Sequence, residues 1–274
     1  MKTTIILKFL MLTLILTVPA LTTHARGISA DELIIYYSFD KDTLEKGEVL
    51  DGSENENHGV IRGNLKIVDE GKVNESMEFP GGAANYIAVR EHHYANLFPE
   101  ITLAAWVKTA QRGMIASWDR SEFFRFAVGD DVGGNAATTF VGFDVCCPIR
   151  DWFGKTDVAD DDWHHVVATF DAELKRIYVD GELDVEAVTD TNTKEIGKAI
   201  TRYGFIGIGS EAGAFGGGTG PNWAFNGLMD EFFLFHRSLS GDEVETLYKS
   251  QGDPFAVEPV DKLSITWGRI KSKK

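Results

Sequence analysis

The chain of 274 residues is poor in cysteine, and its only two cysteines, Cys146 and Cys147, are adjacent. Cysteines that close loops or bind zinc are spaced apart, so neither a disulfide framework nor a zinc site is expected. Neighbouring cysteines can join only through a small strained ring. The sequence leaves this ring and two free buried thiols open as alternatives.

Long apolar runs are also missing, apart from one at the N-terminus. Residues 1–25 start with basic Lys2, continue through a run rich in Leu, Ile, Phe and Met, and end in Thr-His-Ala. This order is typical of a secretory signal peptide, and the run is short for a membrane span of about 20 residues. We expect cleavage after Ala25 and a secreted protein, extracellular, periplasmic or at the cell surface, with no membrane insertion. An uncleaved anchor is the alternative.

Basic residues are scarce as well. The sequence has 27 Lys and Arg against 42 Asp and Glu, a formal net charge of −15. Loss of Lys2 and Lys8 with the signal peptide takes −15 to −17. Such a surface repels the phosphates of nucleic acids and anionic lipids, so those partners are not expected. It can attract cations such as calcium, although solubility alone also explains the charge.

What the sequence has in quantity is short β-strand patterns. Runs rich in β-branched and aromatic residues, separated by Gly, Asp and Asn turns, predict strands at 33–39, 101–107, 123–129, 138–145, 205–210 and 228–236, with three more inside 164–188. One helix is expected after Ser240, because Glu243 completes a capping box. The sequence therefore predicts an all-β antiparallel sandwich with one short C-terminal helix over 26–252. A basic tail over 253–274 follows, as a flexible or docking segment.

Several stretches resemble signatures of the laminin G-like, concanavalin A-like jelly-roll family. The stretch WHHVVATF at 163–170 is similar to the family's W-x-H-V-A-x-T-x-D pattern, and YVDG at 178–181 to its hairpin. The ending GLMDEFFLFHRSLS at 227–240 and the loop DGSENENHG at 51–59 also match in order. Pro80 departs from the pattern, where many members have Asp. The resemblance implies a jelly roll of two antiparallel sheets whose first and last strands are neighbours.

The predicted last strand contains two adjacent carboxylates, Asp230 and Glu231, in an otherwise apolar run. If the first and last strands are antiparallel, Asp40 and the loop after it lie towards Asp230. Asp40, Asp51, Asn57 and Asp230 then form a candidate oxygen ligand set for Ca²⁺, which jelly rolls that this chain resembles often carry as a structural ion. Capping of backbone amides or a salt bridge would also satisfy a buried carboxylate.

Catalysis is not expected from these acids. The resemblance extends to glucanases that carry their acids along one strand as E-x-D-x-E, a spacing that we do not expect in this chain. Retaining hydrolysis needs two carboxyls about 5–5.5 Å apart. A period-two strand would point adjacent Asp230 and Glu231 to opposite faces. The pair His164-His165 is expected to be structural, since no carboxylate or thiol is placed in the sequence to use it.

Aromatic residues in loop segments suggest a binding function instead. Trp152, Tyr203 and Trp223 lie in polar or glycine-rich stretches, with Arg150 and Asn222 beside the two tryptophans. Sugars stack on aromatic rings and hydrogen-bond to polar neighbours, so a non-catalytic carbohydrate-binding module is the preferred function. A protein-interaction or adhesion module is the alternative, a glucanase is a more distant one, and packing at the core edge is the alternative for each aromatic residue.

Overall fold

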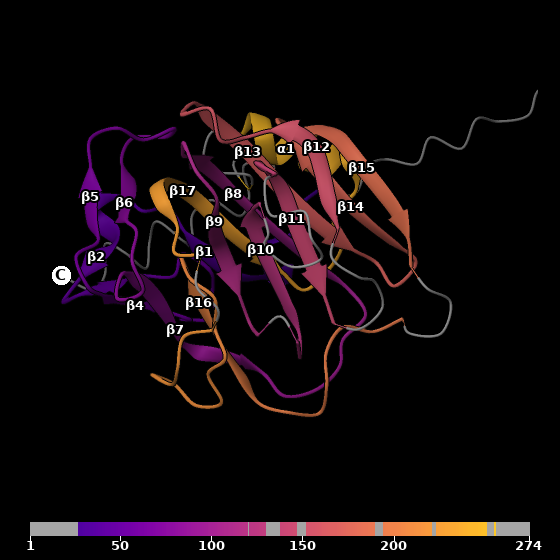
Figure 1. The fold of residues 1–274 in the computed structure, drawn as a ribbon, viewed down its shortest axis with the longest axis horizontal. Helices are drawn as coiled ribbons and strands as arrows, with labels where there is room; N and C mark the ends of the chain where they lie inside the picture. Colours follow the sequence, from indigo (N-terminus) through magenta and orange to yellow (C-terminus); the bar gives the residue numbers. More distant parts are fainter. Residues whose placement is uncertain are drawn as a thin grey trace, which may run out of the picture.

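The computed structural model describes residues 27–119, 121–129, 138–146, 152–189, 194–220, 223–250 and 255. They form two antiparallel sheets packed face to face, with one α-helix outside them (Figure 1). The predicted all-β sandwich with a C-terminal helix is confirmed. The predicted signal peptide lies outside the described residues, as does the tail apart from Phe255.

The first sheet has eight strands and contains both ends of the domain. Its order is β15-β14-β13-β8-β17-β6-β5, and β1 pairs with β17 in addition. The first and last strands are therefore neighbours, as the family resemblance implied. The strands are β1 (Leu33–Tyr37), β5 (Lys66–Val68), β6 (Ser76–Pro80), β8 (Ile101–Lys108), β13 (Trp163–Phe170), β14 (Leu174–Val179), β15 (Glu182–Val188) and β17 (Asn226–Phe235).

The second sheet has nine strands in the order β12-β11-β10-β9-β16-β7-β4-β3-β2. Two short 3₁₀ turns, η1 (Ala30–Glu32) and η2 (Lys41–Thr43), flank β1. The strands are β2 (Leu44–Glu45), β3 (Glu48–Val49), β4 (Gly59–Arg62), β7 (Tyr86–Tyr94), β9 (Gly113–Ser117), β10 (Phe124–Val128), β11 (Phe140–Val145), β12 (Phe153–Asp157) and β16 (Arg202–Ile206).

The strand expected at 205–210 is thus displaced towards the N-terminus. It ends at Ile206 because Gly207 adopts a φ of +88°, and a Cβ there would lie 2.4 Å from the Phe79 ring. Only glycine tolerates both conditions.

Cys146, which directly follows β11, is disulfide-bonded. Cys147, the only other cysteine of the sequence, lies outside the described residues.

A single apolar core fills the space between the two sheets. Fully buried side chains from both sheets meet there, among them Ile87, Val89, Leu103, Phe126 and Phe232. The residues between them along each strand point to the outer faces, because side chains alternate along a strand. The sandwich therefore has two separate outer faces.

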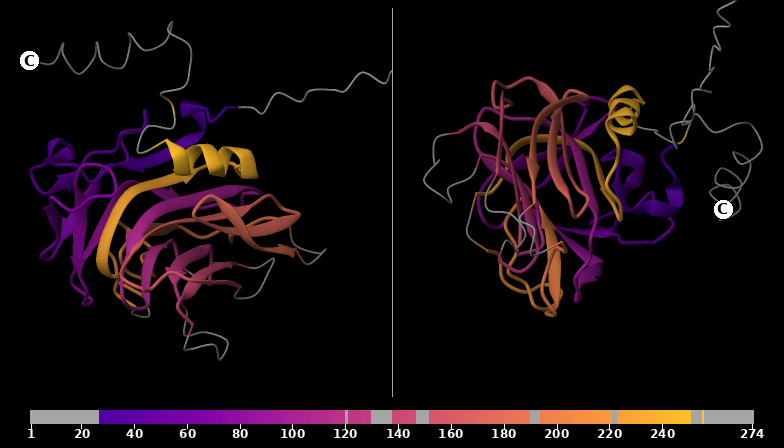
Figure 2. Two further views of the ribbon diagram at one scale, coloured as in Figure 1. Left: turned by 90° about the horizontal axis from the view of Figure 1, so that it is seen from above. Right: turned by 90° about the vertical axis from the view of Figure 1, so that its right-hand side faces the viewer.

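The helix α1 (Gly241–Lys249) covers the outer face of the eight-stranded sheet (Figure 2). Val244 and Leu247 pack on Tyr178, Phe233 and Phe235 of that face. The predicted capping box is confirmed, since Ser240 accepts from the Glu243 amide and the Glu243 side chain accepts from the Ser240 amide. No helix in the described part of the chain is long and apolar enough to cross a membrane.

A bulge in β17 changes the predicted alternation of its side chains. Glu231 has a φ of +51°, and the register with β8 shifts between Asp230 and Phe233. Met229 and Phe232 consequently both face the core, while Phe233 lies on the outer face. The prediction that Asp230 and Glu231 point to opposite faces is wrong. Both side chains lie on the outer face. Asp230 is opposite Trp106 in the pairing of β17 with β8, and Glu231 accepts a hydrogen bond from the Tyr36 hydroxyl.

Candidate functional site

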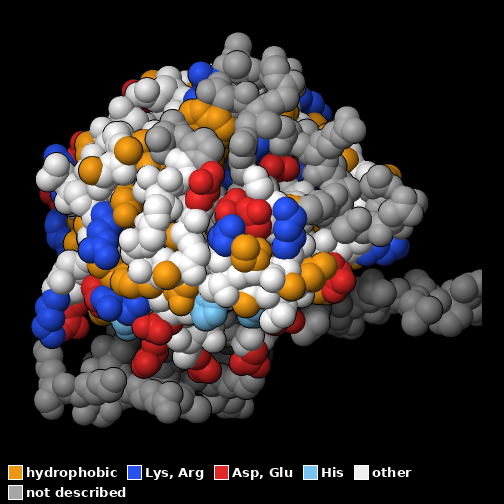
Figure 3. Space-filling view, turned by 60° about the horizontal axis from the view of Figure 1, so that its bottom comes forward, with side chains coloured by type: hydrophobic (Ala, Val, Ile, Leu, Met, Phe, Trp, Pro, Cys, Tyr) orange, Lys and Arg blue, Asp and Glu red, His pale blue; other side chains and the backbone are white. Residues whose placement is uncertain are grey.

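The outer face of the nine-stranded sheet carries a second, smaller cluster of apolar and aromatic residues. Ile87 and Val89 of β7 face the core, so Tyr86 and Ala88 face outward. Phe205, Ile208 and Ala212 complete the buried part of the cluster, and Tyr86, Tyr203, Phe215 and Ala224 pack around it half-buried. On the side where β7 and β16 lie, acidic and basic side chains are mixed among hydrophobic ones (Figure 3).

Tyr203, one of the predicted binding residues, lies in this cluster. Its ring stacks on His93 with centroids 4.9 Å apart and meets Phe215 edge-on at 6.4 Å. Its backbone amide bonds to Ala212 and its carbonyl accepts from the Ser210 hydroxyl at 2.6 Å. The glycine-rich loop that follows β16 is thereby held against the sheet.

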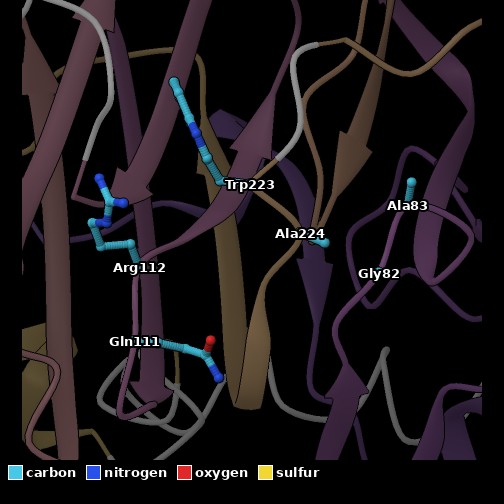
Figure 4. A pocket seen from close by; sticks show the side chains of 6 residues that line it. All are labelled: Gly82, Ala83, Gln111, Arg112, Trp223 and Ala224. Atoms are coloured by element: carbon cyan, nitrogen blue, oxygen red, sulfur yellow. The ribbon is translucent and has the colours of Figure 1, made fainter. Parts of the chain in front are cut away.

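Trp223, the second predicted residue, lines an open pocket of about 490 Å³. Gln111 and Arg112 stand on one side of the pocket, Gly82 and Ala83 on the other, with Trp223 and Ala224 between them (Figure 4). A volume of this size lies within the range of about 300–1,000 Å³ that small-molecule sites occupy. An aromatic ring, polar side chains and exposed backbone are the groups that a sugar ring needs.

The local backbone explains why Trp223 is placed here. Its carbonyl accepts from the Met114 amide at 2.7 Å, which lays residues 223–225 beside β9. Gly113 permits the approach, because a Cβ at that position would lie 2.7 Å from the Phe225 Cα. On the sheet, the Arg125 guanidinium carbon lies 5.5 Å from the indole centroid, at a cation–π distance. Arg125 is buried and pairs with Asp144 at 3.5 Å.

The remaining predicted sugar-binding residues do not join this surface. Trp152 is half-buried and packs against the core between the sheets, the alternative that sequence reasoning left open. Arg150 and Asn222 lie outside the described residues. Sequence reasoning missed Tyr86, although the period-two pattern YIAVR of β7 separates outward Tyr and Arg from inward Ile and Val.

The predicted cation ligands are only partly brought together. Asp230 is fully buried, and its Oδ2 accepts from the Val73 amide at 2.9 Å. Its Oδ1 is buried and has no hydrogen-bond partner among the described residues. Burial raises the pKa of Asp230 to about 7, with a further contribution from the charge of nearby Asp40.

Asp51 and Asn57 are engaged elsewhere. Asp51 accepts from the backbone amides of Tyr36, Ser53 and Asn57 at 2.8–2.9 Å. The Asn57 side-chain amide donates to the Ile34 carbonyl at 2.8 Å. Both residues therefore close the loop after β3 against β1. Within the described ranges, no three His, Cys, Asp or Glu side chains form a group that could hold a metal ion.

The expectation that no E-x-D-x-E spacing occurs in the chain is wrong. Glu182, Asp184 and Glu186 follow E-x-D-x-E along β15, the edge strand of the eight-stranded sheet. Asp184 is buried and accepts from the Lys155 amide and the Thr156 hydroxyl, both at 2.7 Å. Glu186 lies opposite Arg176 and bonds to it, whereas Glu182 lies opposite Val179 of the core beyond a register shift and lines a pocket with Asp184. The two glutamates therefore do not face one groove.

The expectation that no carboxylate serves His164 is also wrong. Its Nδ1 lies 2.9 Å from Asp180 Oδ2 and its Nε2 lies 3.2 Å from Asp160 Oδ1. Burial lowers the pKa of His164, but the two carboxylates outweigh it and leave the pKa raised. With both ring nitrogens occupied, His164 ties the β14–β15 turn to the segment before β13.

Comparison with known proteins agrees with this fold. The family model described as the concanavalin A-like lectin/glucanases superfamily matches residues 81–245, more than half of the chain. The chain belongs to this superfamily. A rat protein, sushi, von Willebrand factor type A, EGF and pentraxin domain-containing protein 1, is 33% identical over 96 residues, which are 34% of this chain and 3% of that protein.

Several solved structures share this fold at low sequence identity. Domain 4 of the extracellular GH43 arabinanase AbnA from Geobacillus stearothermophilus, in complex with arabinotriose, has a TM-score of 0.57 at 17% identity, over 80% of this chain and 98% of that one. The binding domain of Paraclostridial Mosquitocidal Protein 1 has 0.59 at 15%, over 81% and 52%. The botulinum neurotoxin D ligand-binding domain, in complex with N-acetylneuraminic acid, has 0.57 at 12%, over 81% and 52%.

Proposed function

We propose that this chain is a non-catalytic carbohydrate-binding module whose binding surface is the outer face of the nine-stranded sheet. The observation that carries the proposal is the position of Trp223 and Tyr203. Both lie on the one sheet face that α1 leaves open, and Trp223 lines a pocket there with Gln111 and Arg112. The arabinotriose complex of a same-fold domain supports a sugar as the ligand class.

Two features support binding without hydrolysis. Asp230 and Glu231 are almost completely buried, at 0% and 2% exposure, so a substrate cannot reach them. Of the acids of the E-x-D-x-E stretch in β15, Asp184 accepts from the Thr156 hydroxyl and Glu186 binds Arg176, which leaves only Glu182 without such a partner within the described residues. We expect no release of reducing sugar from arabinan or laminarin on prolonged incubation, and measurable release that disappears in Glu182→Gln would overturn this part of the proposal.

The test of binding is affinity electrophoresis of the folded protein through gels that contain arabinan, laminarin, polygalacturonate or dextran sulfate. The parent should be retarded by at least one polymer. Trp223→Ala should weaken that retardation about tenfold, because a stacking ring contributes on the order of 1–2 kcal/mol. Tyr248→Ala on α1 removes an aromatic ring from the opposite side of the molecule and should change nothing. Retardation that is equal in Trp223→Ala would contradict the placement of the site.

A protein ligand is the second candidate, and one observation favours it. Leu97 and Ile200 are 43% and 40% exposed, on the two loops that the Phe98–Ile196 bridge joins. Exposed apolar residues in one place are a common feature of protein interfaces. A folded parent that is retarded by none of the four polymers would favour this second candidate over the first.

We further infer a structural calcium ion at Asp230 and a secreted location. The buried, unpartnered Oδ1 of Asp230 and the neighbouring Asp40 supply two of the oxygen ligands that a calcium ion requires. Asp51 and Asn57 are not part of this set, because the Asp51 carboxylate accepts from backbone amides of the loop and the Asn57 side chain is bonded to the Ile34 carbonyl. Residues 1–25 have the composition of a signal peptide, which supports export.

A further inference from the structure

Two arginines share one aromatic ring on the outer face of the nine-stranded sheet. The guanidinium carbons of Arg62 and Arg90 lie 5.9 Å and 5.4 Å from the ring centroid of Phe215. Phe215 comes from the glycine-rich loop and packs half-buried on the apolar cluster of this face. Both distances are within the range of cation–π contacts, so the ring gathers two positive charges.

Only one of these two charges is compensated. Arg90 forms an ion pair with Glu48, from the neighbouring strand β3. Arg62 has no ion pair and no side-chain hydrogen bond within the described part of the chain, and it is partly exposed. The chain as a whole has a net charge of −15, so an uncompensated arginine at this place is a local departure from the general charge. A guanidinium group that has no ion pair within the protein can bind an anionic group of a ligand.

The surroundings of Arg62 suit a sugar unit. Arg62 lies opposite Tyr86 in the pairing of β4 with β7, so their side chains share the outer face. Tyr86 packs on Phe205 with centroids 4.6 Å apart, which fixes the ring. The same apolar cluster includes Ala224, which lines the Trp223 pocket. A glycan in that pocket would therefore have its next unit within reach of Tyr86, Phe215 and Arg62.

We propose that the surface formed by Arg62, Tyr86, Arg90 and Phe215 binds a sugar unit that carries a negatively charged group, with that group on Arg62. The aromatic rings contact the C–H face of the sugar, and the guanidinium fork binds the oxygens of the anion in a bidentate manner. The inference rests on the proposed carbohydrate-binding function and names its ligand class, an acidic glycan. Carboxylated and sulfated sugars share the required chemistry.

The experiment compares three kinds of polymer: polygalacturonate for carboxylate, dextran sulfate for sulfate, and arabinan as a neutral glycan. Dissociation constants are measured by calorimetry for the parent, Arg62→Gln, Arg62→Lys and Phe215→Ala. The control is Lys249→Gln, which removes one positive charge from α1 on the opposite side, where the side chain is 65% exposed. Thermal unfolding of each variant checks that the domain is folded.

We expect the parent to bind one charged polymer at least about tenfold more tightly than arabinan, and more weakly at about 300 mM than at about 50 mM NaCl. Arg62→Gln should lose that preference while its affinity for arabinan stays within about twofold, and Arg62→Lys should restore part of it, because lysine keeps the charge without the fork. Lys249→Gln should bind as the parent does. The polymer that responds identifies carboxylate or sulfate as the anion.

Other results would overturn the inference. Binding of a charged polymer that is unchanged in Arg62→Gln, or stronger binding of arabinan than of either charged polymer, would exclude Arg62 as an anion-binding residue and leave the carbohydrate-binding proposal intact. Absence of binding to all three polymers by the folded parent would overturn the inference, and absence of binding to laminarin as well would overturn the proposed function. Loss in Lys249→Gln equal to that in Arg62→Gln would show a non-specific charge effect.

Discussion

At the scale of single residues, several buried polar groups connect the fold to pH. His165 is fully buried between Trp106 and Tyr248, at centroid distances of 5.1 Å and 5.8 Å. Burial, together with the positive charge of Lys72, lowers the pKa of His165 to about 3. An imidazole in the unfolded chain takes up its proton near pH 6.5. Between about pH 3 and pH 6.5, His165 is therefore neutral in the folded protein and protonated in the unfolded chain.

This difference predicts a loss of stability in acid. Because the unfolded chain binds the extra proton, the free energy of unfolding should fall as pH falls from about 6.5 towards 3, by on the order of 4 kcal/mol from His165. His165→Phe keeps the ring contacts and should flatten this part of the curve. Urea unfolding between pH 3 and pH 9 measures it. Equal slopes for parent and variant below pH 6 would contradict the assignment, and above pH 7 the two curves should run parallel.

The calcium inference makes a separate prediction about Asp230. Thermal unfolding of residues 26–274 with excess calcium should occur at a higher temperature than with a chelator, since a ligand at one hundred times its Kd stabilises the folded state by about 2.7 kcal/mol. Asp230→Ala should lose this difference. Asp51→Ala removes a residue whose oxygens bond within its own loop, so it should lower the midpoint with and without calcium but keep the difference. An unchanged calcium effect in Asp230→Ala would place the ion elsewhere.

At the scale of secondary-structure elements, α1 depends on its N-terminal cap. The Ser240 side chain accepts from the Glu243 amide, and Glu243 also binds Arg237 through both carboxylate oxygens. Ser240→Ala should lower the free energy of unfolding by about 1 kcal/mol, measured by urea denaturation. Ser240→Asp supplies another capping oxygen and should stay within about 0.5 kcal/mol of the parent. A larger loss in Ser240→Asp than in Ser240→Ala would contradict the capping role.

The elements also show which features the sequence could predict. Strands β8, β13, β14 and β15 are apolar or alternating runs. The predicted limits of β8, and the outer limits of the segment that contains the other three strands, agree with the structure to within one residue. Strands β2, β3 and β5 have only two or three residues and depend on pairing with distant partners, so no local pattern revealed them. The left-handed Glu231 in β17 gives no signal in a period-two pattern, yet it reverses the faces of the residues around it.

The candidate site was predictable only in part for the same reason. Tyr203 and Trp223 stood out as aromatic residues in loop sequence, and the structure places both on one face. Arg62 and Phe215 are 153 positions apart in the printed sequence, and only the pairing of β4 with β7 and the fold of the loop bring them into contact. Trp152 was predicted as a binding residue for the same reason as Trp223, because it lies in a polar loop sequence. Its ring instead packs on the core.

At the scale of the whole molecule, one core draws side chains from both sheets, which predicts a single cooperative unfolding transition. Far-ultraviolet circular dichroism reports the strands, and intrinsic fluorescence reports the six tryptophans, among them Trp106 of β8 and Trp118, which follows β9. The two signals should change at the same urea concentration. Two separated midpoints would mean that the sheets unfold independently, which the shared core does not allow.

The position of β17 has a consequence for how the protein is made. β17 lies between β8 and β6 in the middle of its sheet, yet it is the last strand of the domain to be synthesised. A growing chain that has reached residue 225 therefore lacks the strand that joins the two halves of that sheet. During synthesis, the eight-stranded sheet should therefore be unable to complete its strand pairing until nearly the whole domain has been made. The secreted location that we propose would require the chain to stay unfolded until it has crossed the membrane, and this strand order delays folding in that way.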